Sequence, residues 1–224
     1  MLKAIKMLTE DLHNKERAFN KIHFKDKVVD TFAPYGINKN RLIHFYGEPD
    51  VGKTFIMKNI IENNEDKIFL YISNKLDDIN KMNELNNVSI LISNVFEELI
   101  EFLESLDKNL INVVIIDNFN NMLSKNELLS TFDTKLDNKN YIEKYIKRIT
   151  KLAVEKKFIV FVINGINAVT EKSRYGYLID KESIASIKIE KETLTPDYLR
   201  LKIINERNLI SPNIKKEEKL KLYF

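Results

Sequence analysis

The chain has 224 residues, which is enough for one α/β domain with a full core and short for two. Its 36 basic and 33 acidic residues give a net charge of +3, a balance that neither requires nor excludes a nucleic-acid partner. The absence of cysteine excludes disulfides and thiolate metal sites. No apolar run approaches the length of about 18 to 20 residues that spans a bilayer, so we expect a cytoplasmic protein that does not cross a membrane.

Residues 1–35 carry no strong strand pattern, and we expect a helical N-terminal appendage there, followed by a domain over residues 36–224. From residue 41 onward, short runs of β-branched and aromatic residues alternate with stretches of helical periodicity. This alternation predicts an α/β fold with a mainly parallel sheet flanked by helices. The expected strands are 41–46, 67–72, 88–92, 111–117 and 158–163, and the expected helices follow residue 54 and cover about 76–85, 95–106 and 142–153.

The C-terminal third has a different pattern. Residues 183–189, 199–204 and 219–224 are predicted to form short strands, separated by Pro196 and Pro212. Such closely spaced strands predict an antiparallel extension of the sheet.

One segment, from Gly47 to Thr54, matches the phosphate-binding pattern G-x-x-x-x-G-K-[ST]. A predicted strand precedes it, and apolar residues recur at helical spacing over 55–61. Glycines permit a tight loop whose backbone N–H groups point at phosphate oxygens, and the following helix adds its positive N-terminal end. We therefore predict that this segment binds ATP with Mg²⁺. The predicted contacts are Gly47, Glu48, Pro49, Asp50, Val51, Gly52, Lys53, Thr54 and Phe55.

Three side chains have predicted roles at this site. Lys53 is expected to reach the β- and γ-phosphates and is the predicted catalytic residue, while the hydroxyl of Thr54 is the predicted magnesium ligand. Asp117 ends an apolar strand, where open α/β sheets place ligands. We expect its carboxylate to hold Mg²⁺ through water, opposite Thr54; an aspartate that merely caps a turn is the alternative. No motif distinguishes adenine from guanine.

Other charged residues carry less signal. A basic group at residues 144–151 lies on the polar face of an amphipathic helix and is predicted to be solvated. His13, His23 and His44 have no evident partner set in the sequence, so neither a metal site nor a nucleophilic triad is predicted.

Taken in order, these segments resemble the RecA superfamily, in particular the RadA-like recombinases and their RadB-type paralogues. The resemblance rests on Tyr46-Gly47-Glu48, on Val-Val-Ile-Ile-Asp-Asn at 113–118, on Phe-Val-Ile-Asn at 161–164, and on Arg-Leu-Lys-Ile-Ile at 200–204 before Ser211-Pro212. It implies a RecA-like ATP-binding domain in a recombinase paralogue that assists DNA repair or homologous recombination.

Two departures from that family concern catalysis. In the family, a glutamate that polarises the attacking water follows the strand equivalent to 69–72; here the chain reads Ser-Asn-Lys at 73–75 and has no carboxylate before Asp77 and Asp78. The family's Asn-Gln pair, whose Gln senses the γ-phosphate, is Asn164-Gly165. These differences predict slow hydrolysis, at most a weak DNA-dependent ATPase.

The resemblance also implies partners. The stretch 165–181 is expected to contact single-stranded DNA, with Lys172 and Arg174 at phosphates and Tyr175 and Tyr177 at bases; an ordinary surface loop is the alternative. The expected protein partner is a recombinase, another RecA-like protein or a second copy of this chain. Two alternative functions are a nucleotide-responsive scaffold and a KaiC-like signalling ATPase, both acting through protein partners.

Overall fold

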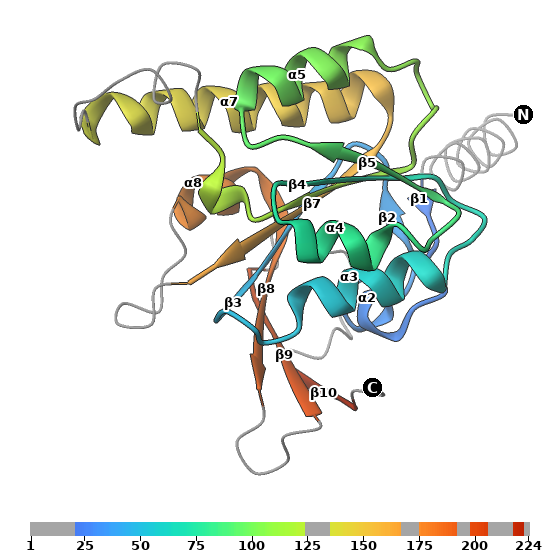
Figure 1. The fold of residues 1–224 in the computed structure, drawn as a ribbon. Helices are drawn as coiled ribbons and strands as arrows, with labels where there is room; N and C mark the ends of the chain where they lie inside the picture. Colours follow the sequence, from blue (N-terminus) through green and yellow to red (C-terminus); the bar gives the residue numbers. More distant parts are fainter. Residues whose placement is uncertain (1–20, 124–134, 167–174, 192–197, 206–216, 222–224) are drawn as a thin grey trace, which may run out of the picture.

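The computed structural model describes residues 21–123, 135–166, 175–191, 198–205 and 217–221. Its centre is an eight-stranded sheet with the strand order β10-β9-β8-β3-β7-β6-β4-β5, covered by helices on both faces (Figure 1). Six strands run parallel: β3 (Leu42–Gly47), β4 (Phe69–Ser73), β5 (Val88–Ile92), β6 (Val113–Asp117), β7 (Ile159–Gly165) and β8 (Ser183–Lys191). The antiparallel strands are β9 (Tyr198–Asn205) and β10 (Glu217–Lys221).

The predicted α/β class, with a mainly parallel sheet and a C-terminal antiparallel extension, is therefore confirmed. One detail differs, because β8 pairs with β3 in parallel and only β9 and β10 belong to the extension. The helices are α2 (Lys27–Phe32), α3 (Lys53–Glu62), α4 (Leu76–Met82), α5 (Phe96–Ser105), α7 (Lys135–Lys156) and α8 (Gly176–Glu182), with a short 3₁₀ helix η1 (Phe119–Asn121). A separate pair of short strands, β1 (Lys21–Ile22) and β2 (Ile37–Asn38), is antiparallel.

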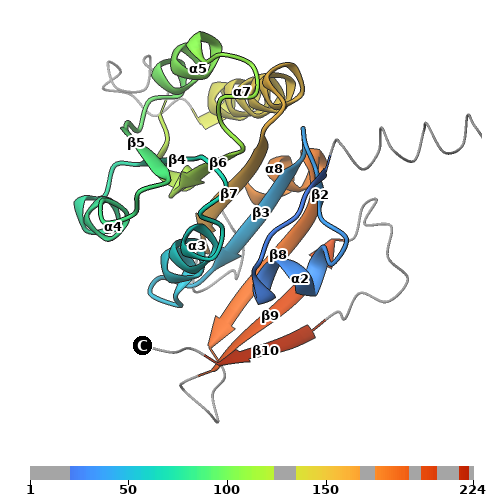
Figure 2. The same cartoon turned by 90° about the vertical axis from the view of Figure 1, so that its right-hand side faces the viewer.

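The helices form two layers, one on each face of the sheet (Figure 2). Successive strand residues point to opposite faces: Ile43 and Phe45 pack in the cluster with α2, α3 and α4, whereas Leu42 packs in the cluster with α5, α7 and α8. Because both faces are covered, the central strands are apolar at nearly every position, which is why their sequences read as continuous runs.

Residues 21–35 pack into the first of these two clusters. The carboxylate of Asp26 accepts hydrogen bonds from the first turn of α2 and from Asn63 Nδ2, the latter at 2.9 Å, which fixes α2 against the end of α3. The ring of Phe32 is fully buried and lies 5.9 Å from the ring of Phe45. The rest of the predicted appendage, residues 1–20, lies outside the described part of the chain.

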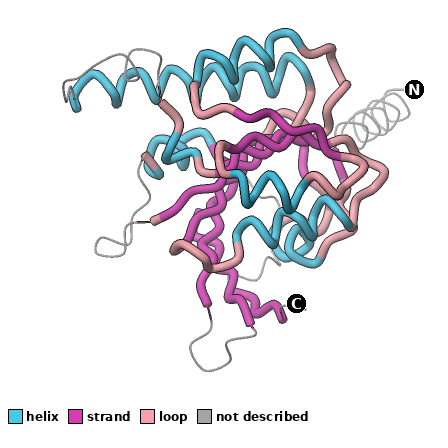
Figure 3. Tube along the Cα trace, in the orientation of Figure 1, coloured by secondary structure: helices cyan, strands magenta, loops and turns pink. Residues whose placement is uncertain are grey.

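The predicted elements occur in the predicted order, with two larger differences in extent (Figure 3). Helix α7 begins at residue 135 instead of 142. Helix α8 occupies the second half of the stretch 165–181 that was expected to be a loop. Among the described residues, no helix combines the length and apolar composition that a membrane span requires.

The topology brings several chain segments to one edge of the sheet. The strands β3, β7, β6 and β4 are neighbours and parallel, so their carboxyl ends lie at the same edge. The loop after β3 and Asp117 at the end of β6 therefore face each other, with the end of β7 between them. This is the edge at which open α/β sheets bind ligands.

Candidate functional site

The loop after β3 has a backbone shape that two of its residues favour for different reasons. Asp50 and Gly52 have φ angles of 57° and 99°, in the left-handed region, where glycine has no steric penalty. Gly47 is required by close packing, because a Cβ atom there would lie 2.3 Å from the carbonyl oxygen of Ile189 on β8. The two glycines of the sequence pattern thus serve a left-handed turn and a close backbone approach.

The loop surrounds the ammonium group of Lys53. Its Nζ donates to the backbone carbonyls of Gly47 at 3.0 Å and Glu48 at 2.5 Å. Burial lowers the pKa of Lys53, and the nearby carboxylate of Asp117 opposes that shift. Helix α3 begins at Lys53, and no side chain caps it, so its first backbone N–H groups are left for an anion.

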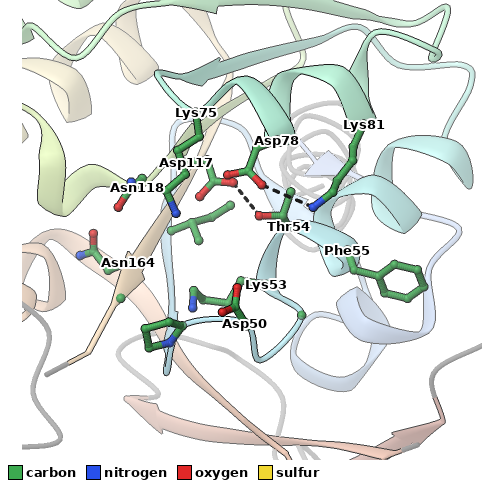
Figure 4. Close-up of a pocket in the computed structure, with 14 residues that line it drawn as sticks. Asp50, Lys53, Thr54, Phe55, Lys75, Asp78, Lys81, Asp117, Asn118 and Asn164 are labelled. Carbon is green, nitrogen blue, oxygen red and sulfur yellow. Dashed lines mark hydrogen bonds and ion pairs between the residues drawn. The ribbon is translucent and has the colours of Figure 1, made fainter. Parts of the chain in front are cut away.

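The opposite wall of the site is acidic. The Thr54 hydroxyl donates to Asp117 Oδ2 at 3.0 Å (Figure 4). The Tyr71 hydroxyl donates to the same oxygen. Only 6% of Asp117 is exposed. Burial raises the pKa of Asp117 and the charge of Asp78 adds to this effect, while the hydrogen bonds from Tyr71 and Thr54 act in the opposite direction. A hydroxyl and a buried carboxylate are oxygen donors of the kind that Mg²⁺ prefers, so this pair fits the predicted cation.

These groups enclose a pocket of about 320 Å³, within the usual size range of small-ligand sites. Its lining comes from the loop and α3, from α4, and from the ends of β6 and β7 (Figure 4). The lining residues are Pro49, Asp50, Gly52, Lys53, Thr54, Phe55, Lys75, Asp78, Lys81, Asp117, Asn118, Ile163, Asn164 and Gly165. The structure thus brings most of the predicted loop contacts together with Asp117. Val51 instead points into the core and is 3% exposed.

Helix α4 supplies pocket residues that were not among the predicted contacts. Asp78 is 8% exposed, and its carboxylate lies 3.7 Å from Lys81 Nζ. Asp77, its neighbour, is exposed. The helical spacing of apolar residues could have shown that Asp78 and not Asp77 is buried, because Asp78 shares a face of α4 with the buried residues Ile79 and Met82.

Three asparagines follow or end the strands beside the pocket. Each has a buried atom without a hydrogen-bond partner among the described residues: Asn118 Nδ2, Asn120 Oδ1 and Asn164 Oδ1. Asn118 and Asn164 line the pocket directly. Buried polar atoms in folded proteins are nearly always paired, so these atoms are suited to bonding a polar ligand.

His44, for which the sequence indicated no partners, is fully buried and has two direct ones. Its Nδ1 lies 2.8 Å from Asp180 Oδ1 on α8, and its Nε2 lies 3.1 Å from Asn164 Nδ2. Asp180 is 136 residues away in sequence, so no local pattern could reveal the pair. The hydroxyl of Ser186 donates to the same carboxylate oxygen of Asp180.

The residues predicted to contact DNA are only partly described. Lys172 and Arg174 lie outside the described residues. Tyr175 precedes α8 with a φ of 60° and packs against the cluster of α5, α7 and α8. Tyr177 is 52% exposed at the start of α8.

A phosphate-binding loop between a strand and a helix, facing a carboxylate at the end of a parallel strand, defines a P-loop NTPase. In agreement with this geometry, the model of the family described as ATPase family associated with various cellular activities (AAA) matches residues 43–163. The chain therefore belongs to the AAA family. A comparison with curated proteins found no match.

The family match extends from β3 to β7 and so includes the loop, α4 and Asp117. It supports nucleotide binding as the general activity of the site. The resemblance to RecA-like proteins is thus confirmed at the level of P-loop NTPases, whereas the narrower recombinase assignment is not confirmed by this match.

Replacing Lys53 tests the phosphate site. A ligand that binds only the folded state stabilises it by about 2.7 kcal/mol when its concentration is a hundredfold above Kd. We expect millimolar Mg·ATP to raise the melting temperature of the wild type, and Lys53→Ala to lose most of that rise. Lys58→Ala, on the solvent side of the same helix, is the matched control and should keep it. An unchanged melting temperature of the wild type with Mg·ATP would contradict the assignment of the loop.

Replacing Asp117 tests the raised pKa of its carboxyl group. Because that pKa is raised above the ordinary value of 3.8, the folded state holds a proton over a pH range in which the unfolded chain has lost it. The free energy of unfolding therefore falls as the pH rises through that range, and the ionised carboxylate destabilises the fold at pH 7. Asp117→Asn should raise the ligand-free melting temperature, by roughly 2 to 4 °C per kcal/mol gained.

The same variant should lose the part of the ATP-induced stabilisation that depends on Mg²⁺. Thermal melts at pH 7, with and without Mg·ATP and chelator, measure both effects. Asp77→Asn removes an exposed carboxylate nearby and should change neither. A lower ligand-free melting temperature for Asp117→Asn would show that the carboxylate stabilises the fold.

Proposed function

We propose that this protein is a nucleotide-dependent switch that binds ATP with Mg²⁺ and hydrolyses it slowly. The observation that carries the proposal is the arrangement of Thr54 and Asp117 opposite the phosphate-binding loop, with a second buried carboxylate, Asp78, in the same pocket. A slow enzyme with a tight triphosphate site spends most of its time in the ligand-bound state, which suits a switch better than a motor.

In this proposal the chain's own groups divide the work of binding. Lys53 and the backbone N–H groups of the loop hold the triphosphate. Thr54 and Asp117 hold Mg²⁺, which when bound neutralises charge on the phosphates. Lys75 adds a second positive charge to the pocket; its charge lowers the pKa of both Lys53 and Asp117.

Asp78 is the residue to which we assign activation of water. Three carboxylates line the pocket, but Asp117 is bonded to Thr54 and Tyr71, and Asp50 is exposed on the loop. Asp78 would accept a proton from a water molecule while the water oxygen forms a bond to the γ-phosphorus. The bond between the γ-phosphorus and the β–γ bridging oxygen breaks at the same time, which gives ADP and phosphate.

Two features of this arrangement favour a low rate. The carboxylate of Asp78 is engaged by Lys81 at 3.7 Å, so this ion pair competes with the water for the base. Asn118, which follows Asp117 and lines the pocket, carries an amide that cannot take up a proton, so it cannot act as a second base for the attacking water.

Paired substitutions on α4 test this assignment. Asp78→Asn should lower turnover by about 10²- to 10⁴-fold, the usual contribution of a general base, with little change in nucleotide affinity. Asp77→Asn should retain the wild-type rate. Phosphate release under single-turnover conditions measures both variants. Turnover by Asp78→Asn at the wild-type rate would exclude this carboxylate as the base, and a wild-type rate near about 10 s⁻¹, the median for enzymes, would contradict slow hydrolysis.

A narrower proposal, based on the sequence resemblance, is that the switch belongs to a recombinase paralogue that assists DNA repair or recombination. Its weak ATPase would respond to single-stranded DNA, and its protein partner would be a RecA-like protein or a second copy. The exposed ring of Tyr177 supports it, because α8 is connected to the pocket through Asp180, His44 and Asn164. A scaffold or a signalling ATPase without a DNA contact is the competing hypothesis.

Substitutions at and before α8 separate these hypotheses. Tyr177→Ala should weaken binding to single-stranded DNA by about 1 to 3 kcal/mol, the usual value of one stacked base, with little change in salt dependence. Lys172→Ala with Arg174→Ala should reduce the slope of log affinity against log salt by roughly 0.7 per lost contact. Fluorescence anisotropy of a labelled oligonucleotide over a salt series measures both. Tyr141→Ala, an exposed tyrosine on α7, is the control; if all variants bind like the wild type, the scaffold is favoured.

A further inference from the structure

A buried polar chain leads from the nucleotide pocket to helix α8 on the side of the sheet away from α3. Asn164, at the end of β7, lies 3.1 Å from His44 on β3, and His44 lies 2.8 Å from Asp180 on α8. The side chain of Ser186 on β8 donates to the same oxygen of Asp180 at 2.5 Å. Neither Asn164 nor His44 is exposed to solvent.

The hydrogen bond between His44 and Asp180 fixes the protonation of one ring nitrogen of the histidine. An ionised carboxylate can only accept hydrogen bonds, so Nδ1 of His44 must carry a hydrogen toward Asp180. The protonation state of the ring is then decided at Nε2 alone. A neutral ring has a bare Nε2, which accepts a hydrogen bond, and a charged ring has an Nε2–H group, which donates one.

The Nε2 atom in turn decides which end of the Asn164 amide faces the pocket. Beside a neutral His44, Asn164 Nδ2 donates to Nε2, and Oδ1 is turned away from the histidine and toward the pocket. In the structure this Oδ1 has no partner among the described residues. Beside a charged His44, Oδ1 must accept from Nε2–H, and Nδ2 is turned toward the pocket. The two arrangements differ by a half-turn of the amide.

We infer that His44 is a positioning residue whose protonation is coupled to binding of the γ-phosphate through the orientation of the Asn164 amide. The inference rests on the proposed binding of a nucleoside triphosphate in this pocket. Anionic phosphate oxygens require a donor, so the triphosphate favours the arrangement that presents Nδ2. That arrangement requires a charged His44, and binding therefore takes up a proton.

The coupling has a defined direction and a defined ligand dependence. Affinity for the triphosphate should fall as the pH rises, by at most about tenfold per pH unit if one full proton is taken up. A diphosphate has no γ-phosphate to bond Nδ2, so its affinity should not depend on His44. By reciprocity, the bound triphosphate stabilises the charged form of His44 to the same extent.

Several charged or titratable groups act on the ring from the surrounding elements. The carboxylate of Asp180 on α8 lies 2.8 Å from Nδ1 of His44. Tyr46 on β3 stacks on His44 with ring centroids 5.0 Å apart, and burial raises the pKa of Tyr46 to about 12, so it stays neutral. On β8, Lys188 is paired with Glu190 at 2.6 Å. From β7 the neighbour is the neutral amide of Asn164.

Calorimetry of binding in buffers of different ionisation enthalpy measures the proton uptake directly. The probes are a non-hydrolysable ATP analogue and ADP, both with Mg²⁺, at pH 7. The wild type should take up more protons with the triphosphate analogue than with ADP. His44→Gln cannot titrate and should lose this excess while still binding both ligands. His23→Gln replaces an exposed histidine and should behave like the wild type.

The ionisation of each ligand contributes the same number of protons in every variant, so this contribution cancels when the wild type and the variants are compared. Equal excess uptake in the wild type and in His44→Gln, or a net release of protons, would overturn the inference. If His44→Gln does not fold, Asp180→Asn serves instead, and it should reduce the excess because the charged ring loses its carboxylate. An excess unchanged in that variant would equally overturn the inference.

The test also separates this inference from the proposed function. If neither nucleotide binds the wild type, both fail. If both nucleotides bind with equal proton uptake, nucleotide binding stands and only the role of His44 is wrong.

Discussion

The position of β3 between β7 and β8 is the constraint on which the candidate site depends. Parallel pairing on both sides brings Gly47 beside Gly165 on β7 and Ile189 on β8, so the phosphate-binding loop starts at the edge where those strands also end. A shift of one residue would turn His44 from the α8 face of the sheet to the α3 face. Register therefore fixes both the loop and the histidine behind it.

Part of the site could be predicted from the sequence because local patterns indicate it. The loop is a local pattern of eight consecutive residues, which was enough to indicate it. The left-handed turn at Gly52 gives one of its glycines a local backbone reason, whereas Gly47 is required by the close approach of Ile189 on β8. The buried parallel strands are recognisable because they are apolar on both faces. Asp117 could be proposed because the end of a strand is itself a position at the binding edge.

The other parts depend on contacts between distant segments. Asp180 and His44 meet only after β8 has paired with β3, and no feature within either segment shows this. For Asp78 and Asp77, the helical spacing of Ile79 and Met82 indicates which carboxylate lies on the buried face of α4, but the packing of α4 beside the loop after β3 is what places that carboxylate in the pocket. The segments beyond the loop that suggested a recombinase are short apolar strands, which other P-loop NTPases also need, and so they identify the class more securely than the subfamily.

The polar groups of the site lie between two well-packed apolar clusters. Asp117, His44 and Asn164 are all buried, and polar groups in that position weaken the fold unless they are paired. The chain retains them within strands whose other residues fill the core. This distribution is expected for a site whose chemistry conflicts with maximal stability.

The two outer strands of the sheet also differ from each other. In β10, four of the five residues are charged, whereas β5 reads Val-Ser-Ile-Leu-Ile and ends at Ile92, which is 65% exposed. Charged edge strands discourage the addition of further strands, and apolar ones permit it. Of the two outer strands of the described sheet, β10 thus discourages strand addition and β5 permits it, so self-association by strand addition, during heating or concentration of the protein, would begin at β5.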